Sequence, residues 1–147
     1  MPDGVILHGT RSGQDFNTTR EMLATLNFVA GGAVGLGWNI TVADNWVCEH
    51  IDSERWGWNA RESSNHHLAV EFAQAKLGTP ISDEQIEAFC WYFVHVMRKS
   101  WPGLPAVFPN HSDLPPGIRD GKTDVEPKGQ HAVRDRIVAK LTAAGAM

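Results

Sequence analysis

The pattern of hydrophobic and polar positions along the chain predicts five short strands. Residues 4–9 (GVILHG) form an apolar run that ends in glycine, which is typical of a buried strand. Residues 37–51 alternate apolar and polar side chains around a turn at Ala43-Asp44-Asn45, which predicts a hairpin. Residues 67–73 (HLAVEFA) and 105–108 (PAVF) predict the last two strands.

The strand at residues 67–73 carries a charged side chain on one of its faces. Its larger apolar side chains point to one side, whereas Glu71 points to the other side, between Ala69 and Ala73. Because both of these neighbours are small, the carboxylate of Glu71 has space around it.

Three segments repeat apolar side chains at helical spacing. The first, at residues 18–30, begins with a capping box of Thr18 and Glu21, and the second begins with one of Ser82 and Gln85. The third runs roughly from residue 130 to residue 144. The apolar positions of the three helices are Met22, Leu23, Leu26 and Val29, then Ile86, Phe89, Cys90, Phe93 and Met97, then Val133, Ile137 and Leu141.

Taken in order, these elements predict an α/β fold with a mixed central β-sheet packed by about three helices. The 147 residues show no repeat and no linker, so we expect one domain over residues 1–147. Residues 51–66 are expected to form an ordered loop. Residues 110–127 are rich in charge, proline and glycine, and we expect neither a helix nor a strand to run through them.

Charge and composition exclude several classes of function. A net charge of −4 without a basic run argues against nucleic acid as a partner, and no apolar run is long enough to span a membrane. The N-terminal segment lacks the basic and apolar regions of a signal peptide, so we expect the protein to be made in the cytoplasm. Cys48 and Cys90 have apolar or aromatic neighbours and are expected to be reduced and buried.

Six tryptophans are unusual in a chain of this size, and four of them lie between Trp38 and Trp58. Aromatic side chains beside glycine or asparagine suit the wall of a groove that binds sugar or peptide. They are equally suited to filling a loop-rich surface. We expect Trp38 at the rim of a site, and Trp91 and Trp101 in packing roles.

Candidate metal ligands follow two predicted strands that are far apart in sequence. His8 ends the first strand and His111 follows the strand at residues 105–108, and the loop after His111 offers several carboxylates. Two imidazoles and one carboxylate, with a fourth position open to water, form a catalytic zinc pattern. On spacing alone, a structural role for each histidine is the more common outcome. Cys48 and His50 make a poor nucleophile pair, because no third group orients the base.

Four motifs resemble, in the same order, those of the type 2 N-acetylmuramoyl-L-alanine amidases. They are ILHGT, GLGWNITVADN, NHHLAVEFAQA and HSDLPPGIRDGKTD, and together they reach from residue 6 to about residue 127. The family includes amidase-type phage lysozymes, muropeptide-recycling amidases and peptidoglycan recognition proteins. The last motif is the most specific of the four.

The resemblance implies a role for five residues of this chain. His8, His111 and Asp124 match the family's zinc ligands, so one Zn²⁺ is the expected cofactor. Lys122 matches the lysine that faces the scissile carbonyl, and Glu71 matches the glutamate that recycling-type members use as acid and base.

Two departures from the family pattern bear on these assignments. Gly37-Trp38-Asn39 stands where lysozyme-type members have Gly-Tyr-His, which removes a phenol but leaves Glu71 for the proton transfer. The segment between Pro116-Gly117 and Lys122 is also longer than the compact family version. Asp120 is therefore an alternative ligand, although the Lys-Thr-Asp spacing favours Asp124.

The implied reaction is hydrolysis of the amide between N-acetylmuramic acid and L-alanine in bacterial peptidoglycan, as in a phage endolysin. Trp38, Asn39 and His67 are the expected substrate contacts, and a monomer is expected. Two alternatives stay open: a cytoplasmic amidase that recycles soluble muropeptides, and a peptidoglycan-binding protein without activity.

Overall fold

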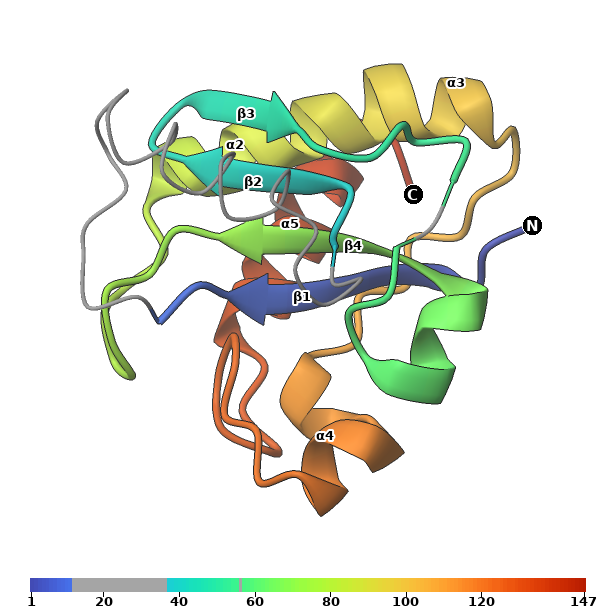
Figure 1. Ribbon diagram of the computed structural model, residues 1–147. Helices are drawn as coiled ribbons and strands as arrows, with labels where there is room; N and C mark the ends of the chain where they lie inside the picture. Colours follow the sequence, from blue (N-terminus) through green and yellow to red (C-terminus); the bar gives the residue numbers. More distant parts are fainter. Residues whose placement is uncertain (12–36, 56) are drawn as a thin grey trace.

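A four-stranded sheet lies at the centre of the computed structural model, which describes residues 1–11, 37–55 and 57–147 (Figure 1). The strand order is β1-β4-β2-β3. Strand β4 pairs in parallel with both β1 and β2, whereas β2 and β3 form the antiparallel hairpin. The strands are β1 (Gly4–Gly9), β2 (Ile40–Ala43), β3 (Trp46–Glu49) and β4 (His67–Phe72). The mixed sheet of an α/β fold is therefore confirmed, while the helix predicted at residues 18–30 lies outside the described residues.

The two faces of the sheet have different roles. One face carries Val5, Leu7, Val70 and other apolar side chains, and helices α2 (Asp83–Tyr92) and α5 (Ala132–Ala143) pack against it (Figure 1). Since side chains alternate along a strand, His8 and Glu71 point to the opposite face. The helices thus fix the sheet from one side and leave the charged side chains on the other.

Helix α2 begins as predicted, with the Ser82 side chain accepting from Gln85 N and the Gln85 side chain accepting from Ser82 N. It continues as a π-helical segment, Phe93–Met97, and a last turn α3, Arg98–Ser100. Helix α5 buries Val133, Ile137 and Leu141 as expected, although it begins two residues later than predicted. None of the helices among the described residues is long and apolar enough to cross a membrane.

Two local predictions are wrong for identifiable reasons. Residues 105–108 do not form a strand; Val107 O accepts a bond from Val5 N of β1 at 3.0 Å, but the next donor along the chain would be residue 109, and Pro109 has no N–H. Residues 110–127 contain two short helices, a 3₁₀ turn at His111–Asp113 and α4 at Pro115–Arg119. The prolines at the start of α4 cost it nothing, because the first N–H groups of a helix have no partner.

The other corrections concern the 51–66 loop and the sulfur and indole side chains. The loop ends in a 3₁₀ helix, Arg61–His66. Both cysteines are free, as expected, and Cys90 is buried, but Cys48 is partly exposed. Trp101 packs against the core, whereas Trp91 is 59% exposed and is not a packing residue.

The buried side chain of Gln85 joins the start of α2 to the sheet. Its Nε2 donates to Val42 O and to Ala73 O, both at 3.0 Å, where β2 and β4 end. We predict that Gln85→Met lowers the free energy of unfolding by roughly 2 kcal/mol, because Ala73 O loses this donor, whereas Val42 O keeps the bond from Ala73 N. Ser82→Ala, which removes only the cap, should cost about 1 kcal/mol. Urea unfolding measures both, and equal losses would contradict this role for Gln85.

Candidate metal centre and active site

Three predicted ligands meet on the face of the sheet opposite helices α2 and α5. Nδ1 of His8 and Nδ1 of His111 each lie 3.1 Å from the same oxygen of Asp124, and the ligand atoms all lie within 4.8 Å of one another. The two imidazole rings have centroids 4.5 Å apart and are almost completely buried. Within the part of the chain that the structure describes, this is the one group of three or more side chains with metal-binding geometry.

Backbone pairing at the edge of the sheet brings the two histidines together. Leu7 N donates to Pro109 O at 2.9 Å, and a β-bridge pairs Leu7 with Asn110. The chain therefore leaves the edge of β1 one residue before His111. His8 follows Leu7 and His111 follows Asn110, so the two histidines are the next pair along the two parallel segments. They become neighbours although more than 100 positions separate them.

Hydrogen bonds close the 110–127 loop, so that Asp124 returns to His111. Ser112 N donates to Asp124 O at 3.0 Å, and the Ser112 hydroxyl donates to Glu126 O at 2.6 Å. At Gly117 the loop packs against its own start, where a Cβ would lie only 1.8 Å from the carbonyl oxygen of His111. The glycine is required by this close approach, and it lets the loop fold back tightly.

The environment of Asp124 favours its ionised form. Burial disfavours the charge, but the imidazoles of His111 and His8, which both face this carboxylate, outweigh burial and hold the pKa of Asp124 well below its usual value. The carboxylate is thus available as an anionic ligand across the whole range in which the protein is expected to work.

Glu71 lies beside the three ligands with the opposite tendency. It pairs in register with His8 on β1 and with Thr41 on β2, which puts its side chain on the same face of the sheet. The residue is only 7% exposed. Burial, and then the negative charge of Asp124, raise the pKa of Glu71 well above its usual value.

Two cations face Glu71 and oppose this rise in its pKa. Lys122 is exposed, and its positive charge lowers the pKa of Glu71, as does that of Arg11. Arg11 was missed by the sequence analysis. Its guanidinium donates to the carbonyl oxygens of Thr123 and Val125, the residues on either side of Asp124. Arg11 thereby holds the ligand segment against the end of β1.

The three expected substrate contacts lie in different surroundings. Trp38 is half-buried and donates from Nε1 to the hydroxyl of Thr41 at 2.7 Å, on the face that carries Glu71. Asn39 is completely buried, and its amide bonds to the backbone of the 51–55 loop and of β4, so it holds the fold rather than facing a ligand. His67 begins β4, about 13 Å along the strand from Glu71.

The remaining candidates lie away from the ligands. Asp120 Oδ2 accepts from Arg61 Nε at 2.6 Å, and Asp120 does not belong to the metal-binding group. His50 Nε2 bonds to the hydroxyl of Thr41 at 2.7 Å, rather than to Cys48. Burial lowers the pKa of His50 to about 4, so it is neutral near pH 7.

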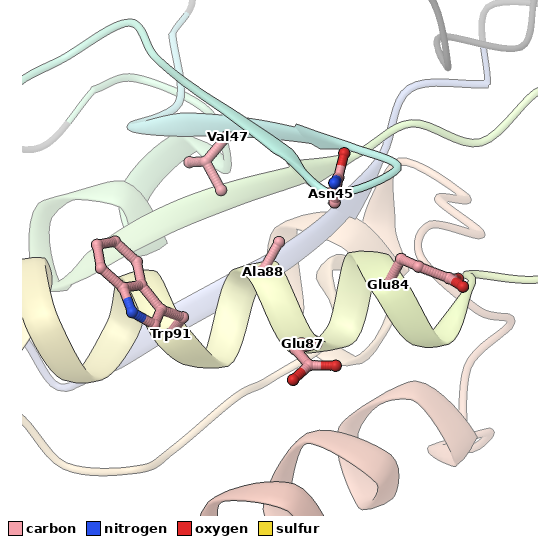
Figure 2. A pocket seen from close by; sticks show the side chains of 6 residues that line it. All are labelled: Asn45, Val47, Glu84, Glu87, Ala88 and Trp91. Atoms are coloured by element: carbon pink, nitrogen blue, oxygen red, sulfur yellow. The ribbon is translucent and has the colours of Figure 1, made fainter.

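A separate groove of about 430 Å³ lies at the far edge of the sheet, between β3 and α2 (Figure 2). Asn45 and Val47 line it from the hairpin, and Glu84, Glu87, Ala88 and Trp91 line it from the helix. Val47 points to the helical side of the sheet because it pairs with Val42 of the core. The groove and the three ligands therefore belong to opposite faces.

The donor set fits a zinc ion. Two imidazole nitrogens and one carboxylate oxygen are the ligands of a catalytic zinc site, and they leave one of four tetrahedral positions open. The spread of the three ligand atoms, 4.8 Å at most, allows one ion to contact all of them. His8, His111 and Asp124 are the residues that would hold it.

Comparison with solved structures identifies the fold. A scan against protein-family models and a search of the curated proteins found no match. A selenomethionine derivative of AmpD superposes with a TM-score of 0.67 at 14% identity, over 92% of this chain and 84% of AmpD. The chain has the fold of the type 2 N-acetylmuramoyl-L-alanine amidases and peptidoglycan recognition proteins.

Two complexes with this amidase fold contain muropeptides. The amidase AmiD from E. coli, bound to anhydro-N-acetylmuramic acid-L-Ala-D-gamma-Glu-L-Lys, has a TM-score of 0.64 at 14% identity, over 93% of this chain and 57% of AmiD. Human PGRP-IβC, bound to a glycosamyl muramyl pentapeptide, has a TM-score of 0.62 at 18% identity, over 76% of this chain and 72% of that protein.

The raised pKa of Glu71 makes the stability of the metal-free protein depend on pH. Above the ordinary glutamate pKa of 4.5, the unfolded chain releases the Glu71 proton while the folded chain retains it. As the pH rises from 4.5, the free energy of unfolding of the wild type should therefore fall relative to that of Glu71→Gln. The total fall should be about 1.4 kcal/mol for each unit by which the Glu71 pKa of the folded chain exceeds that of the unfolded chain. The difference should level off above the folded pKa. Urea unfolding between pH 4 and pH 8 tests this, and a constant difference would contradict it.

Proposed function

We propose that this protein is a zinc-dependent amidase that cleaves the bond between N-acetylmuramic acid and L-alanine in bacterial peptidoglycan. The observation that carries the proposal is the meeting of His8, His111 and Asp124 beside the buried Glu71. The amidase fold supports it, since AmiD holds its muropeptide substrate on the same architecture.

Each side chain has a definite task in this reaction. When bound, zinc supplies a Lewis acid that polarises a carbonyl and makes water acidic near neutral pH. Glu71 accepts the proton of the attacking water and then delivers it to the amine of the departing L-alanine. A shift of its pKa upward from the acidic range is in the direction that suits both steps, because a proton carrier works best when its pKa lies near the working pH.

Lys122 stabilises the negative charge that develops on the carbonyl oxygen. Its positive charge lowers the pKa of both Glu71 and Asp120, which supports a place for this cation near the reacting carbonyl. A positioned charge of this kind lowers the barrier by about 3 kcal/mol where bound substrate excludes water from it.

We further propose that the substrate is the intact wall, and that the protein is made in the cytoplasm and reaches the wall on host-cell lysis if a phage encodes it. Recycling of soluble muropeptides uses the same chemistry and is the alternative. A role in binding alone is disfavoured, because all three ligands and Glu71 are present and correctly grouped.

Mass spectrometry of digested sacculi tests the reaction. Zinc-loaded protein should release peptides that begin with free L-alanine and leave the glycan strands whole. A chelator should abolish the release and zinc should restore it. Cleaved glycan or cleaved cross-links, with muramoyl–alanine bonds intact, would refute the proposed bond. Faster cleavage of soluble anhydro-muropeptides than of sacculi would favour the recycling role.

Matched variants separate the ligands from their neighbours. Asp124→Asn should lose zinc and activity together, whereas Asp120→Asn should retain both, because Asp120 pairs with Arg61 instead. Glu71→Gln should retain zinc and lose about 10²- to 10⁴-fold in turnover. A fully active Glu71→Gln would remove Glu71 from the mechanism.

A further inference from the structure

Asn59 contacts the predicted ligand His8 on the ring nitrogen that faces away from the other ligands. Its Oδ1 lies 3.1 Å from Nε2 of His8, while Nδ1 of His8 faces Asp124. Asn59 is half-buried and belongs to the loop that was expected only to be ordered. Asn59 lies outside all four sequence motifs.

The surroundings of Asn59 fix which way its amide points. Nδ2 lies 2.9 Å from Gly57 O and 3.4 Å from Gly37 O, and a carbonyl oxygen can only accept a hydrogen bond. Exchanging the two ends of the amide would set its oxygen against both carbonyl oxygens. Oδ1 must therefore face His8, where it acts as an acceptor.

The orientation of Asn59 decides where a neutral His8 carries its proton. Because Oδ1 accepts, Nε2 of His8 must donate, and Nδ1 is left with its lone pair. That lone pair points at a carboxylate oxygen of Asp124 only 3.1 Å away. Two lone pairs at this distance repel unless a positive charge lies between them, so the arrangement is prepared for a cation.

We propose that Asn59 is a positioning residue that holds His8 in the Nε2–H form and so prepares Nδ1 to bind the metal. The inference rests on the zinc site of the proposed function. Histidine ligands usually donate their second N–H to an oxygen, which fixes the ring and its tautomer, and loss of such a partner costs about 10- to 100-fold in metal affinity.

Ser64 offers a control, because it holds the same loop without touching His8. Its hydroxyl accepts from Asn59 N at 3.0 Å and from Ala60 N at 2.7 Å. If Asn59 only shaped the loop, Ser64→Ala and Asn59→Leu would have similar effects on the metal. If Asn59 acts through His8, only the second variant should matter.

Zinc affinity, measured by competition with a chromophoric chelator, is the first readout. Asn59→Leu should bind zinc about 10- to 100-fold more weakly than wild type. Ser64→Ala should stay within threefold of the wild-type affinity. Wild-type affinity in Asn59→Leu, or an equal loss in Ser64→Ala, would overturn the proposal.

The tautomer of His8 is the second readout, and it does not depend on zinc or on activity. Long-range ¹H–¹⁵N NMR of the neutral metal-free protein should show the proton on Nε2 of His8 in wild type and a mixture in Asn59→Leu. A wild-type proton on Nδ1 would refute the role of Asn59. Failure of wild type to bind zinc, with the proton on Nε2, would instead refute the zinc site alone.

Discussion

The site depends on one carboxylate oxygen of Asp124 that two buried imidazoles share. Bringing an anion and two rings out of water is costly unless the geometry around them is fixed. The fold meets this requirement with backbone pairing: β1 lies in the sheet and also binds the segment before His111, and Ser112 binds the backbone of Asp124. A shift of one residue in either pairing would separate the ligands.

The same grouping separates the protonation behaviour of two neighbouring carboxylates. The two imidazoles that face Asp124 lower its pKa, whereas burial and the charge of Asp124 raise that of Glu71. Two carboxylates whose environments push their pKa values apart are suited to two tasks, one as a permanent anion and one as a proton carrier. This difference supports the proposed roles of Asp124 as ligand and of Glu71 as acid and base.

Residues whose role follows from their own strand or motif could be predicted from the sequence. The alternation along residues 67–73 placed Glu71 on the face away from the core, and the capping box placed the start of α2. The grouping of His8, His111 and Asp124 came from the family resemblance, because spacing alone left other carboxylates equally suitable.

Residues that act through contacts distant in sequence could not be predicted in this way. Asn59 reaches His8 across 51 positions, and Arg11 reaches Val125 across 114. Neither lies in a pattern that points to its partner. Two residues were expected in roles that their contacts do not fit. Asn39 was expected to contact substrate, but its amide bonds to the backbone inside the fold. Trp91 was expected to have a packing role, but its side chain is exposed.

X-ray absorption at the zinc edge of the zinc-loaded protein tests the grouping of the ligands most directly. The first shell should contain only nitrogen and oxygen at about 2.0–2.1 Å, with the multiple-scattering pattern of two imidazoles. A sulfur neighbour at about 2.3 Å, or the pattern of a single imidazole, would contradict a site made by His8, His111 and Asp124.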